Sequence, residues 1–570
     1  MRPHLRAPRL LISVQGYRRS WLRADLLAGL TVWAVLVPES LAYATIAGVP
    51  PVVGLYAAVA SLVLYALLGS SRHLVVGPMS ATAALSAAIV AGFAVGGTAE
   101  FVAFTAALAI VTGVIGFLAG LLRLGFIASF ISEPVLKGFI VGLALTIIVG
   151  QLPKLFGVEK EPGNFFEQAW GLIGNLGGTS LVTLVVGLVA LAVIVLLRKV
   201  VPLVPGSLVV VLLGVLAVAL FDLDDRGVAI VGPIEPGLPA LGLPAGLGLD
   251  DYLALAGPAV GVLLVGFAEG LGAAKTYAAR AGYDIDANRE LLGLGAANIG
   301  AGLSSGMVVN GSLSKTAVNG SSGARTQVSG LTVAVLTMVT LLFLTGLFEQ
   351  LPEAVLAAVV IVAVVELVDV AALRALYAVW TRRLGSIYGP AARADFAAAV
   401  ATLLGVLVFD TLPGLFIGIA VSLVLLLYRA SRPYVAVLAR TPSAPGPGMW
   451  VDVARSPHGT PTPGVLVARV ESGLFFANAD HVRERLRALA AEHEARAVVL
   501  DAETVPFVDV TAAAMLRQLN ADLERDGIRL LVARDVGQVR DVLAHTSGPS
   551  PTYRTLDEGV AAALDPRTPS

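Results

Sequence analysis

Long apolar segments recur along the first 430 residues and are separated by short polar loops. A helix needs about 20 apolar residues to cross the hydrocarbon core of a bilayer, and many of these segments reach that length. The pattern therefore predicts an α-helical, multi-pass membrane protein of about 14 segments, several of them too short to cross alone. The expected segments cover residues 24–47, 51–69, 77–95, 101–122, 127–150, 178–198, 203–221, 252–274, 289–306, 312–324, 327–347, 351–371, 394–410 and 412–430.

Two segments in corresponding positions begin with small polar residues and a Gly or Pro break. The third segment begins "VVGPMSATAALSAAI", and the tenth, which is third when counted from the eighth, begins "NGSLSKTAVNG". Irregular backbone at membrane depth must line a cavity or be buried in protein, because lipid cannot satisfy its hydrogen bonds. Such a pair indicates a transporter site between two inverted repeats.

The chemistry of these two segments favours an anion. The N-terminus of a half-helix carries unpaired N–H groups and roughly half a positive charge. Two such ends that face each other near the bilayer centre would bind an anion, because their N–H groups replace part of the water that the anion loses. Ser80, Ser312 and Ser314 would add hydroxyl donors, and Lys315 would add positive charge.

The cations alternate between successive loops. By the positive-inside rule this alternation predicts an even number of crossings, with both termini in the cytoplasm and the protein in an inner or plasma membrane. Lys154, Lys160 and Arg226 are the main exceptions. The clustered cations are Arg2, Arg6, Arg9, Arg18, Arg19 and Arg23; Arg72; Arg123; Arg198 and Lys199; Lys275, Arg280 and Arg289; Arg325; Arg374, Arg382, Arg383 and Arg393; and Arg429 and Arg432.

Composition excludes several classes of function. Only 14% of the 570 residues are charged, against roughly 25% in ordinary soluble proteins, and 56% are hydrophobic. A net charge of −1 gives no basic surface for nucleic acid, and the lack of cysteine removes disulfides and thiolate chemistry. The sequence has no nucleophile–base set, metal-ligand spacing or Walker loop, so we expect no enzyme activity, no metal or cofactor, and no ATP-driven transport.

The pattern changes near residue 433. A stretch rich in Pro, Gly, Ser and Thr is interpreted as a linker, and strand-like and helix-like segments then alternate, which predicts a small α/β domain. The expected organisation is an N-terminal cytoplasmic segment (1–23), a transport domain (24–432), a linker (433–464) and a cytoplasmic α/β domain (465–566).

Several long motifs resemble the sulfate permease (SulP) family of anion transporters. They are "PESLAYATIAGVPPVVGLYAA", "GSSRHLVVGPMSATAALS" and the stretch from "GFAEGLGAAKTYAARAGYDIDANREL" to "NGSLSKTAVN". The C-terminal "VVLDAETVPFVDVTAAAMLRQL" is similar to the STAS domain that follows in that family. The resemblance implies fourteen segments in two inverted repeats of seven, as in the uracil-transporter fold. It also implies an elevator movement of a core domain against a gate domain, commonly in a homodimer.

The resemblance also assigns residues to an anion site between the third and tenth segments. One side would be Ser80, Ala81 and Thr82, and the other Gly311, Ser312, Leu313 and Ser314, with Glu39 and Tyr43 of the first segment facing them. Many relatives have Gln at position 39 and Arg at position 315, whereas this chain has Glu39 and Lys315. Lysine keeps the charge but loses the bidentate geometry of arginine. The alternative for Lys315 is a cation that extends into an aqueous vestibule.

Glu269 lies within an apolar segment, where a carboxylate is costly and is a functional candidate by default. The resemblance links an acid at this position to proton coupling, and the absence of a hydroxyl at Ala273 favours H⁺ over Na⁺ as the coupling ion. The structural alternative is that Glu269 pairs with Lys315 or accepts hydrogen bonds from Asn310 or Asn319.

The leading hypothesis is a secondary active, H⁺-coupled transporter of sulfate or a small dicarboxylate. The alternatives are a Na⁺-coupled or exchanging bicarbonate transporter, and a sensor protein that has lost transport.

In the STAS-like domain, Thr511 aligns with the hydroxyl that is phosphorylated in anti-sigma factor antagonists, at a helix start where phosphate would be favoured. Capping of that helix by Thr511 is the alternative.

Overall fold

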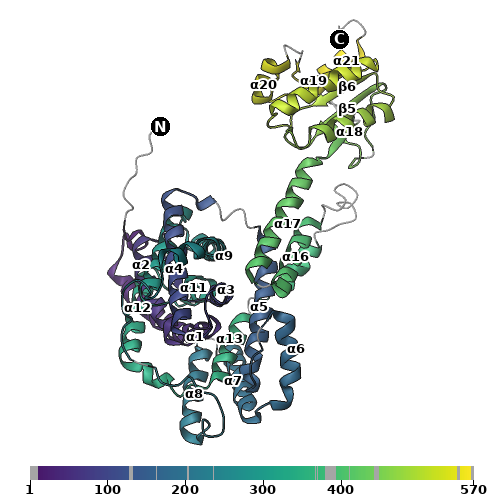
Figure 1. The fold of residues 1–570 in the computed structure, drawn as a ribbon. Coiled ribbons are helices and arrows are strands. Elements are labelled where there is room, and N and C mark those ends of the chain that lie inside the picture. The colour runs from purple at the N-terminus through teal and green to yellow at the C-terminus, as the bar shows by residue number, and fades with distance from the viewer. Residues whose placement is uncertain are drawn as a thin grey trace. The chain divides into compact units, whose positions relative to one another are not determined.

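Figure 1 shows the computed structural model of the chain, which describes residues 10–126, 132–161, 163–201, 204–234, 236–365, 368, 370–378, 393–409, 411–441, 449–456, 458–547 and 552–565. The chain divides into two compact units, Met1–Tyr377 with Asp395–Val421 and Ala378–Ala394 with Ser422–Ser570. Five of the arginines used above to predict orientation, Arg2, Arg6, Arg9, Arg382 and Arg383, lie outside the described residues.

The first unit contains two successive sets of seven segments. The first set is α1 (Leu22–Ile46), α2 (Val52–Leu68), β1 (Val75–Gly77) with α3 (Ser80–Val90), α4 (Ala99–Leu121), α5 (Glu133–Phe156), α7 (Leu181–Val200) and α8 (Gly206–Phe221). The second is α9 (Leu249–Ala281), α10 (Ala287–Leu303), β2 (Asn310–Ser312) with α11 (Leu313–Ser321), α12 (Val328–Val339), α13 (Glu353–Val365), α16 (Ala394–Phe409) and α17 (Thr411–Ser431), whose C-terminal half belongs to the second unit. Within the described part, seven helices are long and apolar enough to cross a membrane, as expected for a multi-pass protein.

The two sets pack in matching pairs. Helix α4 packs against α10, and the corresponding pair, α12 and α2, also packs together. Strands β1 and β2 are corresponding elements of the two sets, and they pair with each other. Helices α5 and α13 contact each other as well. The α4–α10 contact is very close, because a Cβ atom added to Gly113 would lie 2.6 Å from the carbonyl oxygen of Gly295. These contacts agree with the predicted pair of repeats.

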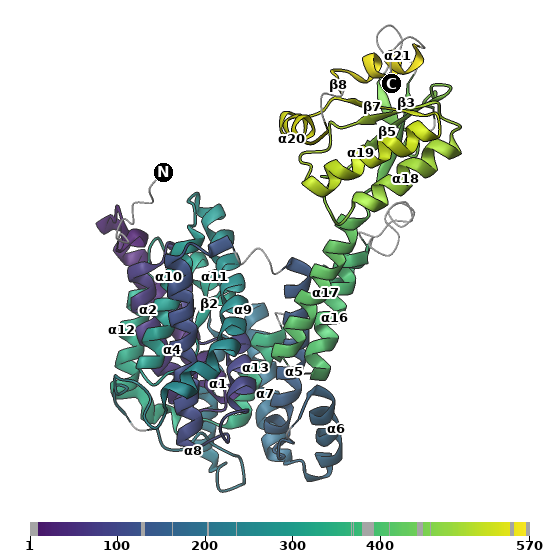
Figure 2. The ribbon, with the colours of Figure 1, turned by 45° about the horizontal axis from the view of Figure 1, so that its top comes forward.

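The helices of this unit form two groups. Figure 2 shows α2, α4, α10 and α12 gathered in one bundle that also holds α1, α9 and α11. Helix α3 contacts α1, α4 and α9 and is counted with this bundle. A second group contains α5, α7 and α13, which contact one another, with α6 (Phe165–Asn175) packed on α5. Helix α16 joins this group, because Gly138 of α5 lies against Ala399. The two groups correspond to the expected core and gate domains.

The second unit is built on a six-stranded sheet of order β4-β3-β5-β6-β7-β8. Strand β3 is antiparallel to both neighbours, and β5 to β8 are parallel. Helices α18, α19 and α20 cover one face of the sheet, and α21 covers the other (Figure 2). The bounds are β3 (Val435–Arg440), β4 (Trp450–Asp452), β5 (Val465–Val470), α18 (Ala479–Glu492), β6 (Ala497–Asp501), α19 (Val510–Arg525), β7 (Arg529–Ala533), α20 (Gly537–Ser547), β8 (Thr552–Tyr553) and α21 (Leu556–Leu564).

The structure differs from the predicted linker at residues 433–464. Strands β3 and β4 lie within that range and pair with the sheet, so this stretch is part of the C-terminal domain. The short apolar run "VAVLA" of β3, with Ala436 and Leu438 buried against α21, is the signal of a strand. The Pro-, Gly- and Ser-rich residues between the two strands obscured that signal in the sequence.

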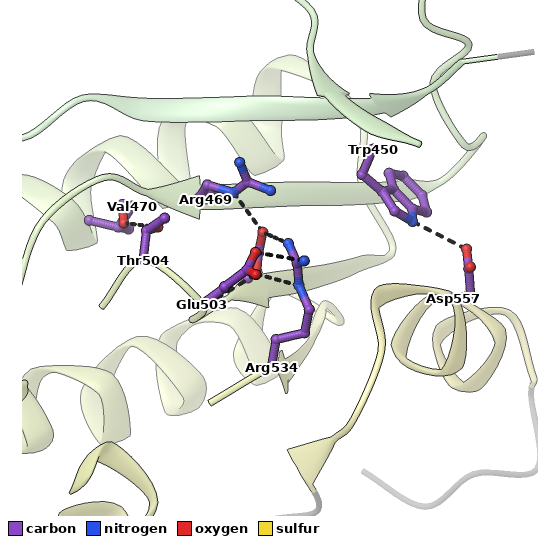
Figure 3. Close-up of polar contacts among 8 residues, drawn as sticks. Trp450, Arg469, Val470, Glu503, Thr504, Arg534 and Asp557 are labelled. Atoms are coloured by element: carbon purple, nitrogen blue, oxygen red, sulfur yellow. Dashed lines mark hydrogen bonds and ion pairs between the residues drawn. The ribbon is translucent and has the colours of Figure 1, made fainter. Parts of the chain in front are cut away.

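A buried acid connects the ends of three parallel strands. Asp501, at the end of β6, is fully buried and accepts a hydrogen bond from Nε of Arg469 at 2.7 Å and another from Nε of Arg534 at 3.0 Å. Figure 3 shows Arg469 and Arg534 converging from β5 and from the end of β7, with Glu503 beside Arg534. A buried carboxylate is tolerated in such a place because both oxygens are paired.

We expect Asp501→Asn to loosen this domain strongly. Removing one partner of a buried ion pair costs about 3 kcal/mol or more, because the remaining charges lose their compensation. Hydrogen exchange in the full chain is expected to accelerate in peptides from β5, β6 and β7. Glu503→Gln is the matched control, since Glu503 pairs with the same Arg534 at 2.6 Å but its side chain is 54% exposed, where an ion pair contributes at most about 1 kcal/mol. Equal acceleration in the two variants would contradict the assignment.

Candidate functional site

The two short helices begin at a shared pair of strands. Strands β1 and β2 are antiparallel, with Val75 opposite Ser312 and Gly77 opposite Asn310. Because each strand leads directly into its helix, α3 and α11 leave this pair in opposite directions and their N-termini lie close together. The helices have only 11 and 9 residues, and α11 ends in a Ser- and Gly-rich stretch in which Gly323 adopts a positive φ of 88°. The structure thus contains the two half-helices that the sequence predicts.

The N-terminus of α3 has no side-chain cap. Met79 occupies the N-cap position, and the first-turn residues Ser80, Ala81 and Thr82 are buried. The first three N–H groups of a helix have no partner within it, so this end is electropositive and a hydrogen-bond donor. The Thr82 hydroxyl donates to the carbonyl oxygen of Met79 at 3.3 Å, so the backbone N–H groups and the hydroxyl group of Ser80 are the donors that face this side.

The N-terminus of α11 is partly satisfied by its own hydroxyl groups. Ser312 is the N-cap and accepts a hydrogen bond from the N–H of Lys315 at 3.2 Å. The hydroxyl groups of Ser312 and Ser314 lie 3.2 Å apart. Ser312 is buried, whereas Ser314 and Leu313 are exposed on the first turn, with Leu313 52% exposed.

Lys315 lies inside the protein and is held by three groups. Its side chain is 0% exposed, and Nζ lies 2.9 Å from Oε2 of Glu39. The same ammonium donates to the carbonyl oxygen of Pro78 at 3.1 Å and lies 4.9 Å from the ring centre of Tyr43. The alternative that Lys315 extends into an aqueous vestibule is therefore wrong for this structure.

Glu39 and Tyr43 reach this place from the middle of α1. The interior residue Pro38 precedes Glu39, and Pro has no N–H to donate to the preceding turn. Glu39 and Tyr43 are one helical turn apart and so share a face of α1, on which both contact Lys315. Oε2 of Glu39 makes no hydrogen bond of good geometry, so its close contact with the ammonium is mainly electrostatic.

Glu269 is hydrogen-bonded to Asn310 and is not paired with Lys315. Its Oε2 accepts a hydrogen bond from Nδ2 of Asn310 at 3.4 Å, and Oδ1 of Asn310 accepts one from the N–H of Gly311 at 2.7 Å. No ion pair joins Glu269 to Lys315 in the described part of the chain, so the pairing with Lys315 is wrong, whereas the hydrogen bond from Asn310 that the same alternative named is present. Asn319 is not a partner of Glu269 either, because its amide donates to the carbonyl oxygen of His73 at 2.9 Å.

Glycines allow β2 to lie directly on α9. A Cβ atom at Gly311 would lie 2.9 Å from Cα of Gly270 and 2.9 Å from a methyl group of Leu74. A Cβ atom added to Gly270 would in turn lie 3.0 Å from Oδ1 of Asn310. The distance between Glu269 and the start of α11 thus depends on the absence of side chains at these two positions.

We expect Gly311→Ala to separate β2 from α9 and to reduce anion uptake by about tenfold or more, since overpacking costs about 1–3 kcal/mol and displaces the backbone. Initial uptake rates in proteoliposomes, corrected for the amount of folded protein, measure the effect. Gly272→Ala is the matched control, because it is on α9 as well and an added Cβ there has no neighbour within 4 Å. An unimpaired Gly311→Ala variant would show that this close contact is unimportant.

A buried hydrogen-bond network, which the sequence pattern does not reveal, fixes the loop before β1. Glu290 of α10 is fully buried and accepts hydrogen bonds from the hydroxyl of Tyr65 at 2.7 Å and from the hydroxyl of Ser70 at 2.6 Å. The N–H groups of Ser70 and Ser71 complete its coordination at 2.9 and 3.0 Å. An acid at the start of an apolar segment was the available signal. This network holds the chain that leads into β1 and α3.

Thr511 is exposed near the start of α19 and does not cap the helix. The cap is Asp509, whose Oδ1 accepts from the N–H of Ala512 at 2.7 Å, while its Oδ2 accepts from the N–H of Phe476 at 2.9 Å. The alternative of a cap by Thr511 is therefore wrong, and the phosphorylation of Thr511 remains a prediction.

The described residues contain no group of three or more His, Asp or Glu side chains that is arranged to hold a metal ion.

Comparisons with known proteins agree with this architecture. Residues 22–384 match the model of the Sulfate permease family, and residues 460–559 match that of the STAS domain. A protein of Mycobacterium tuberculosis named "Probable sulfate transporter" is 37% identical over 559 residues, which cover 97% of each chain. "Probable sulfate transporter 3.4" of Arabidopsis thaliana is 30% identical over 578 residues, covering 96% of this chain and 86% of that protein. These relatives are named as transporters, in agreement with the expectation that the chain is not an enzyme.

Two kinds of solved structure share the fold. The murine solute carrier 26 family member A9 anion transporter, in its inward-facing state, superposes with a TM-score of 0.86 at 23% identity, over 97% of this chain and 94% of that one. The transmembrane domain of a cyanobacterial bicarbonate transporter superposes with a TM-score of 0.61 at 23% identity, over 70% of this chain and 98% of that one. The family model and the relatives along nearly the whole length establish that the chain belongs to the sulfate permease family and carries a C-terminal STAS domain.

Proposed function

We propose that this protein is a secondary active transporter that carries sulfate or a small dicarboxylate, bound between the N-termini of α3 and α11. One observation carries the proposal: an antiparallel strand pair brings two half-helix N-termini together beside a buried ammonium group. The name "Probable sulfate transporter" of both relatives supports the same substrate class. The anion would be held by the N–H groups of the α3 first turn, by the exposed first turn of α11 and by the charge of Lys315.

Glu269 is the proposed proton carrier. It lies in the middle of a membrane-spanning helix and is tied to the start of α11 through Asn310 and Gly311. A proton on Glu269 would change how strongly it accepts from Asn310, and the position of β2 would respond. In this way the charge of Glu269 and the binding of an anion would influence each other without direct contact.

Movement of the core group against the gate group would carry the site across the membrane. The site residues come from α1, α3, α9 and α11, which belong to the core group, so they can move as one body. We assign transport to residues 24–432, and place both termini and the STAS domain, with β3 and β4 included, in the cytoplasm. A homodimer, and regulation through Thr511, complete the proposal.

The direct test uses the purified protein in liposomes with a panel of labelled anions: sulfate, fumarate, bicarbonate and chloride. Each anion is offered with an inward pH gradient, with an inward Na⁺ gradient, and with neither. The proposal expects sulfate or fumarate uptake that a pH gradient drives beyond equilibrium. Bicarbonate uptake that depends on Na⁺ and ignores pH would favour the alternative transporter, and no uptake of any anion would favour a sensor.

A further inference from the structure

The ion pair between Glu39 and Lys315 raises the question of how the site can bind an anion at all. Lys315 supplies the only side-chain cation that contacts the site residues in the described structure, and Glu39 already neutralises it at 2.9 Å. The pair adds no net charge to the site. A doubly charged anion beside Lys315 would also lie close to the Glu39 carboxylate, which repels it.

We infer that Glu39 takes up a proton when a divalent anion binds, and that it thereby sets which anion charge the site accepts. This inference rests on the proposed function and concerns the same site. With Glu39 ionised, Lys315 is compensated from within the protein. With Glu39 protonated, the ammonium needs another counterion, because a buried unpaired charge is strongly unfavourable. A bound dianion supplies that charge, so anion binding and protonation of Glu39 favour each other.

The exposure of the two side chains indicates which of them exchanges the proton. The Lys315 side chain is 0% exposed, and the Glu39 side chain is 10% exposed. The Lys315 ammonium also donates to the carbonyl oxygen of Pro78, a hydrogen bond that its charge strengthens, and it faces the ring of Tyr43 in a cation–π contact that requires the charge. The Oε2 atom of Glu39 has no competing hydrogen bond, so protonation of the carboxylate breaks no further contact at that atom.

Few other ionisable groups surround Glu39. Helices α2, α3, α8, α11, α12 and α13 pack against α1. Of these, α3, α8 and α12 contain no ionisable side chain. The ionisable side chains on the other helices are Lys315 on α11, Glu353 on α13, and Tyr56 and Tyr65 on α2. Glu353 pairs with Lys154 at 3.3 Å, and the hydroxyl of Tyr65 donates to Glu290. Within α1 itself Tyr43 lies one turn away, and Arg23 and Asp25 lie at its start. Lys315 is thus the cation that a change at Glu39 affects first.

The test measures the protons taken up when sulfate binds to the full-length purified protein. Titration calorimetry in two buffers of different ionisation enthalpy, at pH 6, 7 and 8, gives the proton number and the affinity. Glu39 is expected to contribute about one proton per sulfate bound, in addition to any proton linked to Glu269, and this contribution alone lowers the affinity about tenfold for each unit that the pH rises. Chloride should bind with a smaller proton uptake, because it carries half the charge.

Glu39→Gln is expected to take up about one proton fewer per sulfate than the wild type, to show a correspondingly smaller pH slope, and to bind sulfate at least about tenfold more tightly than the wild type at pH 8. Glu39→Asp should restore the pH slope of the wild type, which a purely structural role would not predict. Glu353→Gln, in a second Lys–Glu pair, is the matched control and should behave as the wild type. If Glu39→Gln does not fold, the neutral double variant Glu39→Gln/Lys315→Gln replaces it, with weak binding and about one proton fewer per sulfate than in the wild type as the expected result.

The outcomes separate this inference from the proposed function. Proton uptake per sulfate that is as large in Glu39→Gln, or in the double variant, as in the wild type overturns the inference while anion transport stands. The same holds if Glu269→Gln, and not Glu39→Gln, lowers the proton uptake. If the wild-type protein binds neither sulfate nor any other anion of the panel, the proposed function fails and this inference fails with it.

Discussion

Exchange of Lys315 for Gln is expected to lower the initial rate of sulfate uptake by about a hundredfold or more, which corresponds to about 2.7 kcal/mol of lost stabilisation. Lys315 is the buried cation beside both half-helix N-termini, and Gln can donate a hydrogen bond but carries no charge. The exchange also leaves Glu39 as an uncompensated buried carboxylate, which costs about 3–5 kcal/mol of stability while it stays ionised. Uptake of labelled sulfate into proteoliposomes measures the loss.

Controls must separate the lost charge from lost stability. The double variant Glu39→Gln/Lys315→Gln removes both charges, so it should recover the thermal stability of the wild type but not its uptake. Lys315→Arg keeps the charge and should retain part of the activity, limited by the larger guanidinium in a site closed by Tyr43 and Pro78. Full uptake by the double variant would contradict a role for Lys315 in binding the anion.

The second large effect is expected for Glu269→Gln. This variant should still exchange external for internal sulfate, because it keeps the half-helix N-termini and Lys315. Its sulfate accumulation should respond to a pH gradient with one coupled proton fewer than in the wild type, since Gln cannot bind and release a proton. Each coupled proton changes the accumulation ratio about tenfold for a pH difference of one unit across the membrane, so the dependence on each pH unit should be about tenfold weaker in the variant.

The measurement compares steady-state accumulation at several imposed pH gradients with the rate of exchange at equal pH. Asn310→Asp is an informative companion, because it would place a second acid against Oε2 of Glu269 in place of the donating amide. We expect it to shift the pH dependence of uptake without abolishing exchange. Accumulation by Glu269→Gln that follows the pH gradient as steeply as in the wild type would remove Glu269 from the coupling mechanism.

Much of the fold follows from the sequence, because membrane helices are encoded locally. The apolar lengths and the Gly and Pro breaks before Ser80 and Ser312 predict the two half-helices, and the structure contains both. The predicted linker is wrong because strand pairing is not local. The partner of β3 is β5, about 30 residues further along the chain, and nothing in the proline-rich stretch between them reveals that pairing.

The partners of the charged groups were less predictable than the fold. Glu269 and Lys315 are both charged groups in the site region, and pairing them was a reasonable hypothesis. The structure pairs Lys315 with Glu39 because Glu39 and Tyr43 share one face of α1, which packs against α11. The buried side chain of Glu290 shows the same limit, since its four donors come from Tyr65, Ser70 and Ser71, more than 200 residues earlier. Such contacts depend on helix packing, which periodicity does not specify.

The central claim is that an anion binds between the first turns of α3 and α11. Selenate, a divalent analogue of sulfate, provides the most direct test, because anomalous diffraction from crystals of the full chain locates selenium without any assumption about the site. The account predicts one peak within hydrogen-bonding distance of the N–H groups of Ser80 and Ala81 and near Lys315, and its loss in Lys315→Gln. A peak elsewhere in the membrane unit, in crystals of protein that transports selenate, would contradict it.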